Sequence, residues 1–295
     1  MIVVPGPASK ELGEAVAAEL GLTAEPVEHR IFPDGESYLR LPPAVEGEDV
    51  VLVQTTAPDP DRKMMQLFIM ARTAKDLGAT RITACVPYLA YMRQDKRFLE
   101  GEALSLDVVL GLLEAVGVDD LVVVDAHSAS SLMAMEADHR VKVHNLSAIP
   151  LLAEYVKERG YGGAYSLSPD AGAIHLAAAA ARILGGRHGY FEKSRNRRTG
   201  EIKMKVKDLD VEGVNAVVFD DIISSGGTTA RAVEGLKRQG AANVAAACVH
   251  ALFMPGAEER IKEAGADLTA STDTVESSHA KVTVAGLIAE CVKRL

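Results

Sequence analysis

The chain has 295 residues, of which 48% are hydrophobic and 25% are charged, and its formal net charge is −9. These values are typical of a globular protein and exclude a disordered chain, and the length predicts two domains at roughly 100–200 residues each. The acidic balance argues against nucleic acid as a partner, because proteins that grip its backbone usually carry a basic surplus.

The start of the chain lacks the pattern of a secretory signal, because the apolar residues 2–4 run straight into Pro-Gly. Cys85, Cys248 and Cys291 are far apart and form no CxxC pair. We therefore expect reduced thiols and a cytoplasmic protein. No run of about 18 apolar residues is present, so we expect no membrane as a partner.

A hairpin is predicted near the N-terminus. The strand-like runs 27–31 and 37–41 flank the sequence Phe-Pro-Asp-Gly-Glu at residues 32–36. Pro-Asp-Gly is a turn signal, so the segment predicts two strands joined by a tight turn. Taken from its residues alone, such a turn need not carry any function.

Short apolar runs then alternate with amphipathic segments of helical length. We expect strands at residues 50–53, 82–86 and 121–124, and helices at residues 62–77 and 104–115. This alternation is typical of βαβ units whose parallel sheet is buried on both faces.

An extra segment, residues 91–105, follows the second of these strands and has no counterpart in the rest of the chain. Insertions at the ends of such strands are often functional loops. The segment holds Arg93, Lys96 and Arg97, and such a cluster of cations suits a polyphosphate. A solvated run of charges is the alternative on the residues alone.

The second half repeats the order of the first. Gly-Ala-Thr-Arg-Ile at residues 78–82 and Gly-Ala-Ala-Asn-Val at residues 240–244 each lead into an apolar strand. The predicted fold class is therefore α/β, with two similar domains that are each a mainly parallel sheet flanked by helices. We place them at residues 1–145 and 146–295, with the boundary near Pro150.

Two polar motifs remain open on their residues alone. Asp-Ala-His-Ser at residues 125–128 ends an apolar strand, and Ser-Pro-Asp-Ala-Gly at residues 168–172 precedes an alanine-rich helix. A lone histidine is more often structural than functional, and magnesium prefers oxygen to imidazole. In the second motif, capping of the helix by Asp170 or Ser168 is the structural alternative.

The densest basic stretch lies at residues 192–207, where seven basic residues and one acidic residue follow Glu192. Ile202, Met204 and Val206 alternate with lysines, which is a strand pattern. The stretch predicts a strand-flanked flap with a positive tip. A lid that closes over a charged transition state fits this pattern, and a nucleic-acid-binding arm is the alternative.

A buried strand at residues 217–219 is predicted to end in Asp220-Asp221, followed by Ser-Ser-Gly-Gly-Thr-Thr at residues 224–229 and a helix at about 230–239. Glycines let the backbone approach a ligand, and N–H groups at a helix N-terminus form an anion cradle. The two carboxylates suit the vicinal hydroxyls of a sugar. A plain turn capped by a threonine leaves these acids unexplained, and neither GxxxxGK[ST] nor GxGxxG is present.

The segment from Asp220 to Thr229 resembles the phosphoribosyl-diphosphate fingerprint of the type I phosphoribosyltransferase fold. With the other motifs, the chain resembles the ribose-phosphate pyrophosphokinases over nearly its whole length. The resemblance implies transfer of the β,γ-diphosphoryl group of ATP to the C1 hydroxyl of ribose 5-phosphate, with Mg2+, in a homo-oligomer of at least two subunits. Many members carry Asp where this chain has Ser224. The serine hydroxyl can still contact the phosphate, but this chain lacks the carboxylate of those members.

The resemblance also implies the roles of single residues. It assigns catalysis to Lys193 and Arg195 and metal binding to His127 and Asp170. It assigns ATP contacts to Phe32, Asp34, Gly35 and Glu36, reaching over from a neighbouring subunit, and to Arg93, Gln94 and Asp95. It assigns ribose 5-phosphate contacts to Arg195, Asp220, Asp221, Ser224, Ser225, Gly226, Gly227, Thr228 and Thr229.

Two rival functions share part of this pattern. A phosphoribosyltransferase would keep the loop of residues 220–229 but would have no use for the Arg93-Gln94 motif. A non-catalytic regulatory homologue would be expected to have lost residues of the flap or the loop, and Lys193 and Arg195 are both present.

Overall fold

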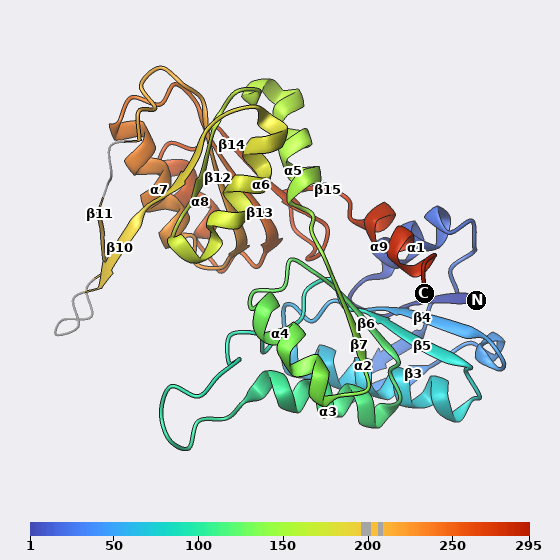
Figure 1. Cartoon of the computed structure of the whole chain (residues 1–295). Helices are drawn as coiled ribbons and strands as arrows, with labels where there is room; N and C mark the ends of the chain where they lie inside the picture. The colour runs from blue at the N-terminus through green and yellow to red at the C-terminus, as the bar shows by residue number, and fades with distance from the viewer. Residues whose placement is uncertain (196–201, 206–208) are drawn as a thin grey trace. The chain divides into compact units, whose positions relative to one another are not determined.

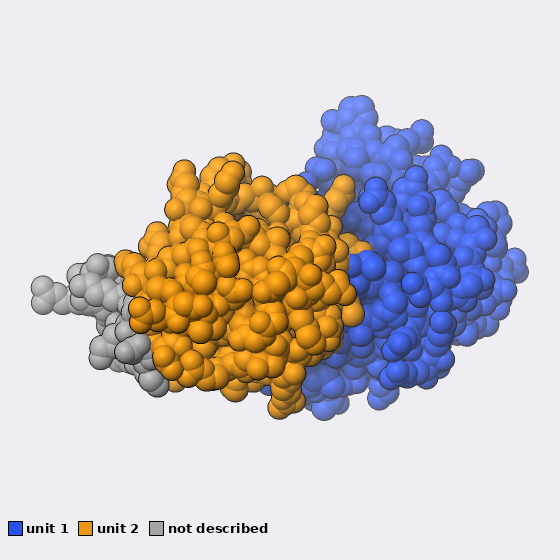
Figure 2. All heavy atoms as spheres, turned by 90° about the horizontal axis from the view of Figure 1, so that it is seen from above, with its two compact units in different colours: residues 1–146, 283–295 blue, residues 147–282 orange. Residues whose placement is uncertain are grey.

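The computed structural model describes residues 1–195, 202–205 and 209–295, and within the strands of residues 192–195 and 202–205 only the backbone is described. The chain forms two compact units, which Figure 2 shows in different colours. Unit 1 contains residues 1–146 and 283–295, and unit 2 contains residues 147–282. The division predicted from the sequence placed residues 283–295 in the second domain, whereas the structure packs them on unit 1.

Unit 1 is built on a five-stranded parallel sheet with the strand order β1-β4-β5-β6-β7. The strands are β1 (Ile2–Pro5), β4 (Asp49–Val53), β5 (Arg81–Cys85), β6 (Asp120–Val124) and β7 (Lys142–Leu146). The helical segments are α1 (Lys10–Glu19), η1 (Pro43–Val45), α2 (Pro60–Asp76), α3 (Ser105–Val116), α4 (Ala129–Met135), η2 (Glu136–Asp138) and α9 (Ala285–Val292). The antiparallel hairpin of β2 (Glu28–Ile31) and β3 (Ser37–Arg40) confirms the predicted turn.

Both faces of this sheet are covered, as the continuous apolar runs predict. One face packs against α2 and α3, where Leu52 and Ile82 contact the same core as Leu67 and Leu110. The opposite face lies under α1 and α9 (Figure 1). The last helix of the chain therefore completes the first unit.

Unit 2 contains a six-stranded parallel sheet with the order β15-β14-β13-β12-β8-β9. Its strands are β8 (Tyr165–Ser168), β9 (His188–Tyr190), β12 (Ala216–Ile223), β13 (Val244–Ala251), β14 (Leu268–Thr272) and β15 (Ala280–Val282). Its helical segments are α5 (Ile149–Val156), η3 (Lys157–Tyr161), η4 (Ala171–Ala173), α6 (Ile174–Leu184), α7 (Gly227–Arg238) and α8 (Ala257–Glu263). The strands predicted to flank the flap are present as the antiparallel pair of β10 (Glu192–Arg195) and β11 (Ile202–Lys205), and the predicted positive tip lies outside the described residues.

All three cysteines are free thiols. Cys85 and Cys248 are buried, and Cys291 is half-buried. Across the described ranges, no helix combines the length and the apolarity needed to cross a bilayer.

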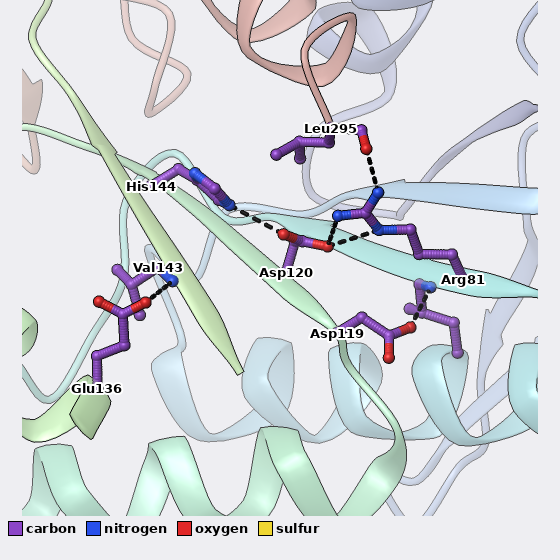
Figure 3. Close-up of polar contacts among 8 residues, drawn as sticks. Arg81, Asp119, Asp120, Glu136, Val143, His144 and Leu295 are labelled. Atoms are coloured by element: carbon purple, nitrogen blue, oxygen red, sulfur yellow. Dashed lines mark hydrogen bonds and ion pairs between the residues drawn. The ribbon is translucent and has the colours of Figure 1, made fainter. Parts of the chain in front are cut away.

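The end of the chain is held to unit 1 by a network of charged groups, which Figure 3 shows. The buried carboxyl group of Asp120 accepts hydrogen bonds from Arg81 Nε at 2.8 Å and pairs with Arg81 Nη2 at 2.6 Å. His144 Nε2 lies 2.9 Å from the other Asp120 oxygen. Arg81 Nη1 donates in turn to the main-chain carbonyl of Leu295. Arg81 thus joins β5 and β6 to the C-terminus.

We predict that Asp120→Asn lowers the free energy of unfolding by about 1–3 kcal/mol, because it removes the charged acceptor of a hydrogen-bonded guanidinium. Urea unfolding followed by circular dichroism measures this loss. Asp119→Asn is the matched control, because Asp119 is the exposed neighbour whose carboxyl group accepts a main-chain hydrogen bond from Ile82. Equal stabilities of the two variants would show that the network does not stabilise the unit.

Candidate active site

The predicted phosphate loop lies between β12 and α7. Gly226 is the N-cap of α7 and adopts a left-handed backbone with φ +72°. Glycine is required there twice over, since a Cβ would also lie 2.8 Å from the carbonyl oxygen of Ala257. An N-cap glycine supplies no side-chain cap, so the first-turn N–H groups of α7 suit an anion. The predicted helix start near residue 230 was too late, because α7 begins at Gly227.

The strand that carries the paired acids is longer than the sequence predicted. β12 does not end at Asp220-Asp221, because its pairing with β13 continues through Ile222 and Ile223. Its pairing with β8 on the other side stops at Val218. The two acids therefore lie on a stretch of β12 that is paired on one side only. The carboxyl ends of parallel strands are the usual ligand edge of such sheets.

The electrostatics of this edge are those of crowded carboxylates. Burial raises the pKa of Asp220 well above its usual 3.8, and the negative charges of Asp221 and Asp170 raise it further. The carboxyl oxygens also bind the local backbone, since Asp221 N donates to Asp220 Oδ1 at 3.1 Å and Ile222 N donates to Asp221 Oδ1 at 2.8 Å. The edge is thus suited to a cation or to hydroxyl donors.

Asp170 comes to this edge from a different segment. Its Oδ1 accepts hydrogen bonds from Gly172 N at 3.0 Å and Ala173 N at 3.3 Å, which caps η4. Ser168 Oγ donates to the carbonyl of Asp170 at 2.7 Å and fixes the turn. Asp170 therefore caps η4, whereas the alanine-rich helix α6, for which the sequence offered this cap as an alternative, begins at Ile174 without a side-chain cap. Asp170 also raises the pKa of Asp220 by its charge.

The flap residues Lys193 and Arg195 lie on β10, where they are the partners of Met204 and Ile202 in β11. Their side chains fall outside the part of the chain that the structure describes. The chain enters the flap directly after Phe191, which is fully buried.

In unit 1, the ends of β5 and β6 bring two motifs together. Ser131 Oγ of α4 donates to Asp95 Oδ2 at 2.6 Å, and this hydrogen bond lowers the pKa of Asp95. Gln94 is held at the start of α3, where its Oε1 accepts from Ser105 Oγ at 3.1 Å. Arg93 is exposed beside them. The Arg-Gln-Asp motif is thus tied to the segment that begins with His127.

The backbone before His127 is strained. Asp125 has φ +37°, in the left-handed region that non-glycine residues rarely adopt, and its side chain is buried. Asp125 N donates to the carbonyl of Leu146 at 2.7 Å, and Ala126 N donates to Asn145 Oδ1 at 3.0 Å. These contacts fix the backbone immediately before His127, whose side chain is exposed. Strain of this kind often accompanies functional sites.

The predicted hairpin presents its tip to solvent. Phe32 N donates to the carbonyl of Glu36 at 2.8 Å, and Gly35, with φ +95°, closes the turn by donating to Phe32. The ring of Phe32 is 39% exposed and lies 5.2 Å from the guanidinium of Arg30. Asp34 and Glu36 are exposed beside it. An aromatic face with two acids suits a flat ligand that carries amino groups.

Each unit thus gathers a separate part of the predicted set. Unit 1 brings Gln94 and Asp95 to the segment of His127, and unit 2 brings Asp170 to Asp220 and Asp221. Ser131 and Asn145 are supporting residues that the sequence did not reveal, because they lie 36 and 19 residues from their partners. No local pattern marks a contact over such a separation.

Comparisons with known proteins match a family model to each unit. Residues 1–117 match the family model described as the N-terminal domain of ribose phosphate pyrophosphokinase. Residues 164–282 match the phosphoribosyl transferase domain. The two matched segments belong to unit 1 and unit 2, respectively.

Curated relatives match over nearly the full length of the chain. A ribose-phosphate pyrophosphokinase of Methanothermobacter thermautotrophicus is 41% identical over 97% of this chain and 98% of its own. One of Saccharolobus solfataricus is 39% identical over 93% of both chains. The crystal structure of phosphoribosylpyrophosphate synthetase from Mycobacterium smegmatis matches with a TM-score of 0.87 and 29% identity, over 99% of this chain and 97% of that one.

Proposed function

The chain belongs to the ribose-phosphate pyrophosphokinase family, and we propose that its unit 2 holds ribose 5-phosphate at the edge of β12. The loop of residues 224–229 takes the 5-phosphate, and Asp220 and Asp221 take the ring hydroxyls. The observation that carries this proposal is the geometry of the loop. Its N-cap residue, Gly226, has no room for a side chain, because a Cβ there would lie 2.8 Å from the carbonyl oxygen of Ala257. The loop follows two acids on a stretch of β12 that is paired on one side only.

The protein is an ATP-dependent transferase, a ribose-phosphate diphosphokinase. It transfers the β,γ-diphosphoryl group of ATP to the C1 hydroxyl of ribose 5-phosphate, giving 5-phosphoribosyl 1-diphosphate and AMP. The oxygen of C1 bonds to the β-phosphorus while the bond from that phosphorus to the α-phosphate oxygen breaks. Such a reaction depends on positioning and on charge stabilisation more than on covalent help from the protein.

The ATP contacts are assigned to unit 1. Arg93, Gln94 and Asp95 are assigned to the polyphosphate. Hydrogen bonds from Ser105 to Gln94 and from Ser131 to Asp95 fix their segment near the ends of β5 and β6, which supports this assignment. The exposed Phe32, with Asp34, Gly35 and Glu36, serves the adenine end. As in the resemblance drawn from the sequence, the hairpin acts on the site of a neighbouring subunit, so the active enzyme is at least a dimer.

Lys193 and Arg195 of the flap are assigned to catalysis. Cations that approach the transferred group stabilise the charge that develops on its oxygens. Arg195 also contacts the substrate. The placement of both residues on one short strand supports their joint action.

Magnesium fits the residues of the β12 edge. Burial raises the pKa of Asp220, and the negative charges of Asp221 and Asp170 raise it further, so a divalent cation bound here would offset that repulsion of the Asp220 carboxylate. Among the described residues, no three His, Cys, Asp or Glu side chains are placed to hold a metal by themselves. A magnesium held by Asp170 in unit 2, or by His127 in unit 1, would take its other ligands from phosphate oxygens and water, as magnesium usually does. When bound, the ion neutralises phosphate charge.

Asp220→Asn tests the sugar site and the pH dependence together. The pKa of Asp220 in the folded state lies above its usual 3.8, so ionisation of this group costs stability. The cost is absent below about pH 4 and grows as the pH rises toward the folded-state pKa. We therefore expect Asp220→Asn to be more stable than the natural protein at pH 7 and equally stable below about pH 4, as measured by urea unfolding.

The same variant is expected to bind its substrate less well. Loss of a charged hydrogen-bond acceptor is worth about 1.5–3 kcal/mol, so KM for ribose 5-phosphate is expected to rise by roughly 10–100-fold while KM for ATP stays nearly constant. Release of AMP measures the rate. Asp210→Asn, at an exposed residue of unit 2, is the control. An unchanged KM would remove Asp220 from the sugar site, and the absence of AMP release by the natural protein would refute the assigned reaction.

We assign the enzyme to the cytoplasm, because its three thiols are free and thiols stay reduced in that compartment.

A further inference from the structure

Helix α7 carries a cation near the end at which cations are disfavoured. Its last turn holds Lys237 and Arg238, which suit the negative end of the helix dipole. Arg231 lies instead in the second turn, and side chains on a helix lean toward its N-terminus. Its guanidinium reaches back over the first turn, where Nη1 lies 3.7 Å from the position that a Cβ on Gly227 would occupy. Arg231 therefore lies beside the positive end of the dipole.

The described part of the chain does not compensate this placement of Arg231. The first turn of α7 contains no acidic residue. Arg231 is exposed, and among the described residues it has no hydrogen bond and no ion pair. A cation beside the positive end of a helix destabilises the free protein, and local conflicts of this kind are expected at functional sites. A bound anion would remove the conflict.

Other hydrogen-bond donors lie close to the same guanidinium. Ser225 Oγ lies 3.9 Å from the Cβ position of Gly227, so this hydroxyl and Arg231 Nη1 border the same space. Gly227 leaves that space open because it has no side chain. The first N–H groups of α7, which have no partner within the helix, open at the same end. A guanidinium, a hydroxyl and main-chain N–H groups together suit the several oxygens of a phosphate.

The carbonyl oxygens of the loop are bonded to a different segment. Met254 N donates to the carbonyl of Ser224 at 3.0 Å, and Arg260 Nη1 of α8 donates to the carbonyl of Ser225. A carbonyl oxygen repels an anion, so these hydrogen bonds leave the donors of the loop for the ligand. Arg260 is thus engaged by the loop itself, whereas Arg231 is available to a ligand.

We propose that Arg231 is a specificity-determining residue that binds the 5-phosphate of ribose 5-phosphate. This inference rests on the proposed function of the loop of residues 224–229 as the site of that phosphate. A guanidinium presents parallel N–H donors that match the oxygens of a phosphate, and the phosphate charge cancels the conflict of Arg231 with the helix dipole. The 5-phosphate lies at the opposite end of the sugar from the reacting C1 hydroxyl. Arg231 therefore contributes to binding and not to the transfer step.

Steady-state release of AMP tests this division. Arg231→Gln is expected to raise KM for ribose 5-phosphate by roughly 10–100-fold, because it removes a charged hydrogen-bond donor, while kcat and KM for ATP stay nearly constant. Arg231→Lys is expected to lose less, because lysine keeps the charge but not the planar fork. Arg238→Gln, at an exposed arginine in the last turn of the same helix, is the matched control. An unaltered KM in Arg231→Gln, or an equal rise in the control, would overturn the proposal.

The dependence of binding on ionic strength separates a direct contact from an indirect effect. Calorimetric titration with ribose 5-phosphate is expected to show that Kd of the natural protein rises with salt, because salt screens exposed charge pairs. Kd of Arg231→Gln is expected to rise less steeply, since one such pair is missing. Equal salt dependences of the two proteins would refute a direct contact between Arg231 and the phosphate.

Urea unfolding tests whether Arg231 has a structural role. Without ligand, the unfolding midpoint of Arg231→Gln is expected to equal or exceed that of the natural protein, because arginine and glutamine have similar helix propensities and the unfavourable charge is gone. Saturation with ribose 5-phosphate at one fixed concentration is expected to raise the midpoint of the natural protein more, in proportion to its tighter binding. A lower midpoint of the ligand-free variant would instead show that Arg231 stabilises the fold.

The sugar site and the role of Arg231 fail in different ways. If calorimetry shows no binding of ribose 5-phosphate to the natural protein, the loop is not its site and both proposals are refuted. If the natural protein binds the sugar phosphate and Asp220→Asn weakens that binding, but Arg231→Gln does not, only the role of Arg231 is refuted.

Discussion

Replacing Lys193 with alanine is expected to lower the rate of AMP release by about 10³–10⁵-fold, the effect of removing a cation that stabilises a phosphoryl-transfer transition state. Lys193 lies on β10 of the flap, in a stretch whose positive charge contrasts with the acidic chain as a whole. The change removes charge from the transition state but not from the β12 edge. We therefore expect KM for ribose 5-phosphate and the fold to be nearly unaltered.

The measurement is steady-state AMP release with both substrates saturating, together with calorimetric titration of ATP. Lys281→Ala, at an exposed lysine of β15, is the control for loss of a positive charge from unit 2. Full turnover by the Lys193 variant would remove this lysine from the mechanism. A weakened binding of ATP with unchanged turnover at saturation would instead assign Lys193 to ground-state binding.

Phe191→Ala is expected to reduce the free energy of unfolding by about 3–5 kcal/mol, because it empties a large and fully enclosed site. The ring of Phe191 is 0% exposed and belongs to the same core as Val218 and Leu236. It rests directly on α7, where a Cβ on Gly235 would lie 2.9 Å from Phe191 Cζ. Phe191 therefore anchors the base of the flap to the helix that begins at the phosphate loop.

Urea unfolding compares the free energies of unfolding of the variants Phe191→Ala and Phe98→Ala. Phe98 is 68% exposed, so the same chemical change at that position is expected to alter stability by no more than about 0.5 kcal/mol. Phe191→Leu refills part of the cavity and is expected to recover part of the loss. If Phe191→Ala proved as stable as Phe98→Ala, the flap would not be anchored by this ring.

Much of the fold follows from patterns that extend over a few residues. The apolar runs around residues 50–53 and 121–124 appear as β4 and β6, and the Pro-Asp-Gly turn appears as the β2–β3 hairpin. The strand predicted from the alternating pattern of Ile202 and Met204 with lysines appears as β11, which pairs with β10. Strand and turn preferences depend on residues that are close in the sequence, so they can be predicted from the sequence alone.

The candidate site was predictable in its parts but not in its assembly. The residue types alone predicted that Asp220 and Asp221 accept hydrogen bonds from sugar hydroxyls and that the glycine-containing loop binds a phosphate. The upward shift in the pKa of Asp220 also depends on Asp170, which comes from a segment 50 residues earlier. The extension of β12 beyond Asp221 depends on β13 pairing past the point where β8 stops.

The sequence by itself determined the periodic elements, the two-fold repetition of α/β architecture and the residue types at each motif, because these are properties of neighbouring positions. Only the tertiary structure decided that α9 returns to unit 1, where Arg81 binds the carbonyl of Leu295 across 214 positions. It also decided that Ser131 fixes Asp95. The apolar face of an amphipathic helix predicts that this face is buried. The surface against which it packs is formed by residues that are distant in the chain.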